Sequence, residues 1–295
     1  MSTPQRGIFI EGNRFLHVLE YTLNDGASPE SIAVALQAAR ESNVEVVVAF
    51  GSSLWARLAH DRMPKGFTDF QTIEGPKARI TSTQRDILVW LHGPTRDDVL
   101  DAAMAVDGVL STVAKLELDL PGFVYRDSRD LTGFVDGSAN PEDDAGKREA
   151  ALVPEGELGA GGAIVFSSTW EHDLHKFHAQ SVEDQENVIG RTKADSIEME
   201  GDDLPVNSHV GRTDIKVDDV AQKMYRRSFP YGTAGKPGLY FIAFCCEQER
   251  LDNVINNMYG LGQDGVTDHL LDFTTPVTGS YWFAPCEEDL KAALE

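Results

Sequence analysis

The first 124 residues carry two pairings of a helical pattern with a strand pattern. Apolar residues recur at helical spacing over residues 29–42, and a β-branched run over 44–50 then predicts a buried strand. A short apolar run over 87–92 predicts another strand, which a Gly-Pro turn separates from an amphipathic helix over 96–110. This part of the chain therefore alternates strands with helices that can cover a sheet.

The rest of the chain repeats the second pairing. Residues 241–246 have an apolar strand pattern, and a helical pattern over 250–258 follows after a few residues. Aligning the two strand–helix pairs places Met104 opposite Met258. The repeat is faint, but it puts the same unit at equivalent points of two halves.

These two similar halves predict the class of fold. We expect an α+β protein with tandem ferredoxin-like halves, 1–124 and 125–295, that form one compact unit. The sheets would lie face to face with helices outside, as a dimeric α+β barrel-like sandwich. Residues 125–157 are rich in Gly, Asp, Asn and Pro and predict a long loop rather than a linker. Long ordered loops inside compact domains are usually functional.

Composition and charge exclude several classes of protein. A hydrophobic content of 41% with 25% charged residues is typical of a globular chain and too apolar for a disordered one. The net charge of −22 repels phosphate backbones and anionic lipid headgroups, so we expect no nucleic-acid or membrane partner. Residues 1–13 lack an apolar stretch of signal-peptide length, and no segment approaches the length of a membrane span.

The cysteines indicate the compartment. Cys245, Cys246 and Cys286 cannot all pair, and two of them are adjacent within an apolar run. No CxxC motif or Cys/His cluster indicates a zinc or iron–sulfur site. We expect buried thiols in a reducing compartment, and hence a cytoplasmic protein.

One segment of the long loop carries candidate chemistry. Residues 133–141 read Gly-Phe-Val-Asp-Gly-Ser-Ala-Asn-Pro. An Asp-Gly pair is common in turns, where the carboxylate bonds its own backbone. Here two apolar residues precede Asp136 and draw the loop toward the core, where a carboxylate needs a partner or a function.

This segment resembles the GxxDG signature of the dye-decolourising peroxidases, most closely their bacterial B-type branch. Three further segments are similar to that family in order and spacing: Gly190-Arg191-Thr-Lys, Ser208-His209 and Arg226-x-Ser228. The resemblance spans nearly the whole chain. It implies a haem b cofactor in a pocket of the C-terminal half.

The resemblance also implies a role for each matched residue. His209 corresponds to the proximal axial ligand of the haem iron, and Asp136 and Arg226 correspond to the distal residues that activate peroxide. Arg191 would pair with a haem propionate. Ser228 would belong to the distal hydrogen-bond network, in a position where many relatives carry Asn.

Several assignments stay open at this point. Arg227 is an alternative distal arginine. Asp268 resembles the acid that accepts a hydrogen bond from the proximal histidine, and Asp272 competes with it. Phe244 and Phe273 would pack against the haem, although ordinary core packing explains each of them equally well.

A different metal site has to be weighed. His172, His175 and His178 recur at three-residue steps. On a helix such steps spread the three rings over roughly 120° of arc, which suits two ligands of one metal better than three. No other cluster completes the set, so a polar helix face is the interpretation we favour.

Together these features predict a haem peroxidase. It would reduce hydrogen peroxide and oxidise dyes or other aromatic one-electron donors through a ferryl intermediate. Asp136, kept ionised beside Arg226, would move the proton between the peroxide oxygens, and Arg226 would stabilise the negative charge that develops. Bulky dyes would not enter a small cavity, so electrons would cross from the surface through candidates of which none is assigned: Tyr125, Tyr225, Tyr231, Tyr281 and Trp282.

Two other functions remain possible from the sequence. A haem-handling protein that binds haem or releases its iron would use His209 and Arg191 but would need neither Asp136 nor Arg226. A haem-free α+β assembly module would need none of them. Related proteins imply a homodimer or a higher homo-oligomer.

Overall fold

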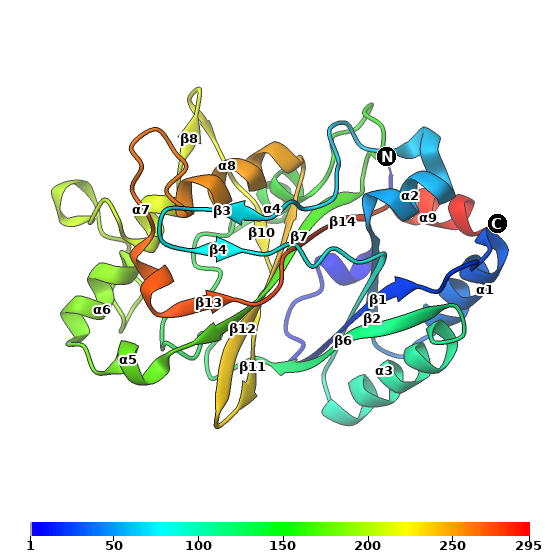
Figure 1. The fold of residues 1–295 in the computed structure, drawn as a ribbon, viewed down its shortest axis with the longest axis horizontal. Coiled ribbons are helices and arrows are strands. Elements are labelled where there is room, and N and C mark those ends of the chain that lie inside the picture. The colour runs from blue at the N-terminus through cyan, green and yellow to red at the C-terminus, as the bar shows by residue number, and fades with distance from the viewer. Residues whose placement is uncertain (1) are drawn as a thin grey trace.

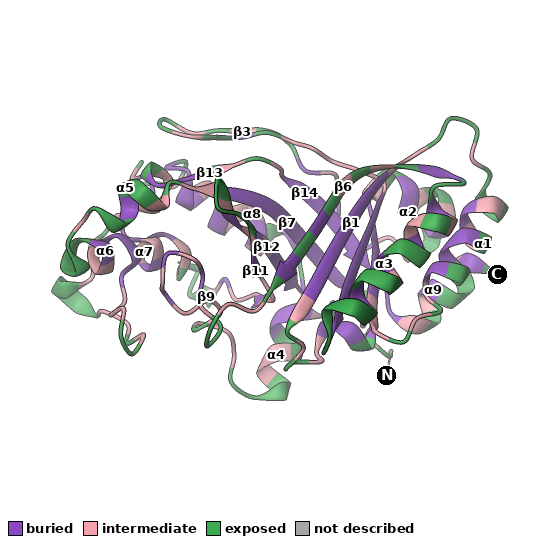
Figure 2. Cartoon of the chain, turned by 90° about the horizontal axis from the view of Figure 1, so that it is seen from below, coloured by how far each residue is buried: buried purple, intermediate pink, exposed green. Residues whose placement is uncertain are grey.

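The structure, a computed structural model, describes residues 2–295. Its strands lie in the middle of the molecule. The helices of the N-terminal half lie toward one end together with the C-terminal helix, and the helices of residues 174–213 lie toward the other end (Figure 1). Figure 2 shows most of the central strands buried and many helix residues exposed. Among the described helices, none is long and apolar enough to cross a membrane.

The N-terminal half has the β-α-β-β-α-β order of a ferredoxin-like unit. Its strands pair antiparallel in the order β6-β1-β5-β2. Helix α1 begins at Pro29, and the Ser28 side chain caps it by accepting from the backbone N–H of Ser31. The main elements are β1 (Phe15–Leu23), α1 (Pro29–Ala39), β2 (Glu45–Phe50), α2 (Ser52–Ala59), β5 (Ile87–Gly93), α3 (Arg96–Leu110) and β6 (Ala114–Phe123). Smaller elements are the 3₁₀ helices η1 (Arg6–Ile8) and η2 (His60–Arg62) and a hairpin of β3 (Ile73–Glu74) and β4 (Arg79–Ile80).

The C-terminal half repeats this order with a longer irregular insertion. Its strands pair antiparallel in the order β11-β12-β7-β14. The helices are α4 (Asp144–Ala151), α5 (Leu174–His178), α6 (Val182–Ile189), α7 (His209–Thr213), α8 (Gln248–Met258) and α9 (Glu287–Leu294), with turns η3 (Gly201–Asp203) and η4 (His269–Asp272). The strands are β7 (Ala163–His172), β8 (Lys216–Val217), β9 (Val220–Ala221), β10 (Tyr225–Arg226), β11 (Phe229–Thr233), β12 (Lys236–Cys245), β13 (Thr274–Pro276) and β14 (Ser280–Ala284).

The two sheets also join at their edges. Within the described residues, ten strands form one sheet, and the pairing of β12 with β7 closes it on itself. The halves meet through the pairs Tyr231–Gly122 and Phe283–Phe50. A Cβ on Gly122 would lie 2.0 Å from the Phe229 ring, so this close approach requires glycine.

The expected α+β class and ferredoxin-like halves are thus confirmed, with a barrel between them. The barrel interior is apolar and aromatic, with side chains such as Trp90, Tyr240 and Trp282. The helices cover the outer faces of the sheets and enclose a second core. The repeat holds for the elements but not for single positions, because Met104 is 58% exposed whereas Met258 is buried.

Candidate active site

A cavity with two lobes lies between the outer face of the C-terminal sheet and the helices that cover it. The larger lobe encloses about 1100 Å³ of space, part of it open to solvent, and has apolar walls from β7, β12 and α8. The smaller lobe encloses about 760 Å³ and reaches the long loop and the end of α6. Asp136, His209 and Arg226 line both lobes, so the cavity brings together residues from three distant segments. Its size and apolar walls are typical of a cofactor site.

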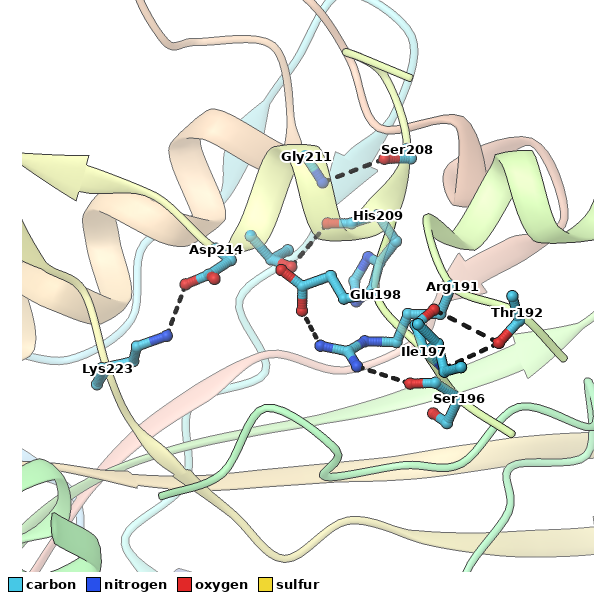
Figure 3. A network of polar contacts seen from close by, with 11 residues as sticks. Arg191, Thr192, Ser196, Ile197, Glu198, Ser208, His209, Gly211, Asp214 and Lys223 are labelled. Atoms are coloured by element: carbon cyan, nitrogen blue, oxygen red, sulfur yellow. Dashed lines mark hydrogen bonds and ion pairs between the residues drawn. The ribbon is translucent and has the colours of Figure 1, made fainter. Parts of the chain in front are cut away.

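His209 is held by the start of α7. Ser208 is the N-cap, and its Oγ accepts from the backbone N–H of Gly211 at 3.1 Å (Figure 3). The His209 ring bonds through Nδ1 to Oδ2 of Asp268 at 2.7 Å. Within residues 2–295 no protein group bonds Nε2, and the His209 side chain remains 27% exposed. The ring is therefore oriented through one nitrogen and leaves the other available to a ligand.

Asp268 and Asp272, which the sequence left as alternatives, are separated by the structure. The Asp268 side chain is fully buried, and its second oxygen accepts from the backbone N–H of Leu270 at 2.8 Å. Asp272 lies at the exposed end of η4, where its carboxylate is 3.6 Å from His269. Of these two aspartates, Asp268 is the one that contacts the His209 ring.

Asp136 lies half-buried in the long loop, with its backbone N–H donating to Ser128 at 3.0 Å. Gly137 follows at φ +78°, a conformation that favours glycine. Burial raises the pKa of Asp136 above its usual range, although the positive charge of Arg226 opposes this. The attraction of Arg226 is thus smaller than the desolvation of the carboxyl, and the carboxylate of Asp130 also raises this pKa.

Arg226 is fixed at its backbone by a residue of the same loop. Its N–H donates to Oδ1 of Asn140 at 2.9 Å, and Nδ2 of Asn140 donates to the Arg226 carbonyl at 2.8 Å. The sequence motif of the loop contains Asn140 but does not predict this role, since a pairing with a residue so distant in the chain leaves no local pattern. The loop and β10 are thereby locked together, which sets Asp136 beside Arg226.

The two neighbouring arginines point to different sides of the strand. Arg226 lines the cavity, whereas the guanidinium of Arg227 donates to the carbonyls of Ile8 and Ile10 at 2.6 and 2.7 Å. It also lies 5.1 Å from the Trp90 ring centroid. Successive side chains of a strand face opposite ways, so Arg227 ties the N-terminal half to the barrel and does not face the cavity.

Ser228 leaves a buried polar group without a partner. Among the described residues, its Oγ makes no hydrogen bond of good geometry. The hydroxyl lies close enough to Asp136 to lower the pKa of that carboxyl slightly. A buried hydroxyl of this kind marks a place for water or a small polar ligand.

Arg191 has a protein partner that the sequence did not predict. Helix α6 ends at Gly190, with φ +88°, and Arg191 follows at once. Its guanidinium binds the Glu198 carboxylate and donates to the Ser196 carbonyl at 2.9 Å (Figure 3). Arg191 and Glu198 both line the smaller lobe with His209.

A separate polar cleft of about 960 Å³ reaches the same residues from another direction. Its lining includes Asp136, Arg226 and Ser228, and also Glu11, Tyr125 and Arg129. His209 lines the apolar cavity but not this cleft. The Asp136–Arg226 pair thus borders both an apolar cavity and a polar approach.

The two expected packing phenylalanines lie elsewhere. Phe244 is in the barrel interior, and Phe273 packs in a small cluster with Phe177, at a ring separation of 5.4 Å. We correct both assignments, since neither is among the residues that line the cavity. Because side chains alternate along β12, Leu239 and Phe241 face the cavity while Phe244 faces away.

The three spaced histidines do not share a helix face. His172 ends β7, and its ring contacts Asp130 at 3.1 Å and Thr274 at 2.8 Å. His175 and His178 lie on α5 and are exposed. No group of three potential metal ligands occurs among residues 2–295.

Comparisons with known proteins agree along the whole chain. Residues 13–123 match the family model described as "Dyp-type peroxidase, N-terminal" and residues 127–289 match "Dyp-type peroxidase, C-terminal". The chain is 33% identical over 271 residues to the dye-decolorizing peroxidase of Mycobacterium tuberculosis, covering 90% of this chain and 81% of that protein. It is 31% identical over 255 residues to that of Brevibacterium linens, covering 85% and 70%.

Solved structures show the same likeness. A putative dyp-type peroxidase from Shewanella oneidensis superposes with a TM-score of 0.90 at 30% identity, covering 98% of both chains. A variant of Rhodococcus jostii RHA1 DypB in complex with heme also gives a TM-score of 0.90, at 28% identity and 98% coverage of both chains.

Proposed function

This chain belongs to the Dyp-type peroxidase family, and we infer from that membership that it reduces hydrogen peroxide at a bound haem and oxidises one-electron donors. One observation carries the inference further: the buried Asp268 orients His209 toward a cavity that Asp136 and Arg226 also line. The roles of single residues below are our proposal.

The cavity residues fit a haem. The walls of the larger lobe are mostly apolar, as a porphyrin plane requires. The His209 ring has one nitrogen hydrogen-bonded to a carboxylate, and among the described residues no protein group bonds the other. The unpartnered Ser228 hydroxyl supports a small polar ligand near Asp136. When bound, haem b would supply an iron that binds peroxide and holds the oxidising equivalents taken from it.

We assign the proximal side to His209 and Asp268. Nε2 of His209 would hold the haem iron, and Asp268 would accept from Nδ1–H, fixing the tautomer and the ring orientation. The capped start of α7 holds the backbone of His209 in place.

We assign the distal side to Asp136, Arg226 and Ser228. Asp136 would accept the proton of the inner peroxide oxygen and return it to the outer oxygen. Its position beside Arg226, where both residues line the cavity and the polar cleft, suits this task. The positive charge of Arg226 would stabilise negative charge on the peroxide, and the polar cleft would admit peroxide to this pair.

Arg191 is proposed to bind a propionate. Its guanidinium has five N–H donors, of which the contacts with Glu198 and Ser196 use only part. A haem-handling protein would use His209 and Arg191 in the same way. It would have no use for the Asp136–Arg226 pair, so we favour the peroxidase.

The test is haem binding by the purified chain. We expect a Soret absorbance band that His209→Ala largely removes, because apolar packing and propionate pairing alone hold haem weakly. His175→Ala is the matched control, since this exposed residue of α5 should leave the band intact. A full, unshifted Soret band in His209→Ala would show that another residue holds the haem iron.

Organisation beyond the site is also proposed. We propose that residues 1–124 and 125–295 act as one unit and that the chain forms a homodimer or higher homo-oligomer in the cytoplasm. Exposed apolar side chains on α1 and α3, among them Val34 and Met104, support association. The three free, buried cysteines support a reducing compartment. Light scattering would give the mass to compare with the 32.4 kDa of one chain.

A further inference from the structure

Tyr225 lies next to the site but faces away from it. Both of its chain neighbours, Met224 and Arg226, line the cavity, whereas the Tyr225 side chain is fully buried in the barrel interior. Its ring stacks on Phe9, with ring centroids 5.6 Å apart and an interplanar angle of 14°. The ring is therefore separated from the cavity only by the strand that carries it.

The hydroxyl of Tyr225 reaches the polar cleft through Glu11. It donates to Oε1 of Glu11 at 2.6 Å, and Lys147 donates to the same oxygen at 2.8 Å. The Glu11 side chain is 55% exposed and lines the cleft together with Arg226. A fully buried phenol is thus hydrogen-bonded to a carboxylate that is open to solvent.

The charge states suit transfer of a proton between these two groups. Burial raises the pKa of the Tyr225 phenol, so it is protonated near neutral pH. Burial also tends to raise the pKa of Glu11, but hydrogen bonds from Lys147 and Tyr225 bring it below its usual value. Glu11 is then an ionised base, already at hydrogen-bond distance from the phenol proton.

We propose that Tyr225 is an electron relay between the cavity and the polar cleft, with Glu11 as the acceptor of its proton. This proposal rests on the proposed peroxidase function, which supplies the oxidant. One electron passes from Tyr225 to the enzyme oxidised by peroxide, and the hydroxyl proton passes to Oε1 of Glu11. The products are a neutral Tyr225 phenoxyl and a neutral Glu11 carboxyl.

The relay is then reset from the cleft. An aromatic donor too large to enter the cavity gives one electron to the Tyr225 phenoxyl, and Glu11 returns the proton to the phenol oxygen. Atoms and charge balance in each step. Removing an electron from a phenol makes its hydroxyl strongly acidic, so a base in contact is what allows this tyrosine to be oxidised.

A second buried pair provides a matched comparison. Tyr240 also lies between two residues that line the cavity, Leu239 and Phe241, and its hydroxyl donates to Glu20 at 2.8 Å. Glu20, however, is only 2% exposed. A proton on Glu20 would have no direct contact with solvent, and a bulky donor could not approach this carboxyl. The Tyr240–Glu20 pair should therefore not relay electrons from bulky donors.

The experiment uses the haem-loaded full chain labelled with ring-deuterated tyrosine. Samples are frozen within milliseconds of mixing with hydrogen peroxide, and electron paramagnetic resonance records the label-sensitive tyrosyl signal. We expect Tyr225→Phe to abolish the signal and to slow oxidation of an anthraquinone dye at least about tenfold, the cost typical of losing a proton-transfer group being about 10²–10⁴-fold. The rates of hydroquinone oxidation and of the first reaction with peroxide should change less than about twofold, since the proposal gives Tyr225 no part in those steps.

Two further variants separate a relay from a structural role. Glu11→Gln keeps a hydrogen-bond acceptor but removes the base, so the tyrosyl signal should form at least about tenfold more slowly at equal haem content. Tyr240→Phe should keep both the signal and the dye rate. A tyrosyl signal and dye rate in Tyr225→Phe equal to those of the parent chain would overturn the relay.

The relay and the proposed function fail in different ways. A parent chain that binds no haem, or whose spectrum does not respond to peroxide, overturns the proposed function and the relay with it. A parent chain that reacts normally while Tyr225→Phe and Glu11→Gln behave identically to it overturns the relay alone.

Discussion

The pairing of His209 with Asp268 can be tested by a single-atom change. Asp268→Asn keeps the size of a fully buried side chain but leaves one carbonyl oxygen where the carboxylate has two acceptors. Those two oxygens now serve Nδ1 of His209 at 2.7 Å and the backbone N–H of Leu270 at 2.8 Å. If the new amide keeps the Leu270 contact, its NH₂ group faces the Nδ1–H of His209, donor against donor.

The loss expected from this change follows from the position of Asp268. It holds the proposed iron ligand rather than the iron, and losing such a partner typically weakens metal binding by about 10–100-fold. That corresponds to about 1.4–2.8 kcal/mol of binding free energy. We expect the haem dissociation constant of Asp268→Asn to rise by this factor.

The assay is a haem titration of the apo-protein, followed by the growth of the Soret band. Asp272→Asn is the control, because Asp272 is exposed and its carboxylate lies 3.6 Å from His269, away from His209. Its dissociation constant should stay within about twofold of the parent, as expected for a surface pair of this kind. Near-ultraviolet circular dichroism checks that both variants fold. Equal haem affinities of Asp268→Asn and Asp272→Asn would refute the reasoning.

Four other variants probe the distal side and the barrel. Asp136→Ala and Arg226→Ala should keep haem but slow the spectral response to hydrogen peroxide in stopped-flow mixing, by about 10²–10⁴-fold and 10²–10³-fold respectively; parent rates in both would reject the distal assignment. Asn140→Ala removes both hydrogen bonds to the Arg226 backbone and should slow the same response by up to about 10²-fold through misplacement, with haem content as the control. Burial raises the pKa of Glu20 from 4.5 to about 7, so between these pH values the folded chain holds a proton that the unfolded chain loses. The associated stability is present below pH 4.5 and is lost as pH rises through 7. Relative to the parent, Glu20→Gln should therefore gain about 3 kcal/mol in free energy of unfolding between pH 4 and pH 8, measured by denaturant titration, and a constant difference would contradict the raised pKa.

The sequence by itself determined the elements and the main candidates. Side-chain periodicity is a property of the local backbone, so the apolar spacing over 29–42 and 96–110 predicted helices that the structure contains as Pro29–Ala39 and Arg96–Leu110. The short motifs around Asp136 and His209 were also readable, because a loop signature and a helix cap each lie within a few consecutive residues.

The tertiary structure decided which distant groups meet and which way they face. Asp268 rather than Asp272 contacts His209, because only Asp268 lies buried at the start of η4. Asn140 supports Arg226, and Glu198 binds Arg191, through pairings that no spacing in the sequence announces.

Phe241 and Phe244 show that the sequence also leaves open which face of a strand lines the cavity. Alternation predicts that Phe241 and Phe244 face opposite sides of β12, but it does not say which side is the cavity. That depends on closure of the sheet into a barrel, which puts Phe244 inside the barrel and Phe241 under the helices. Local patterns set local geometry, whereas facing and partnership arise only when separate elements pack against one another.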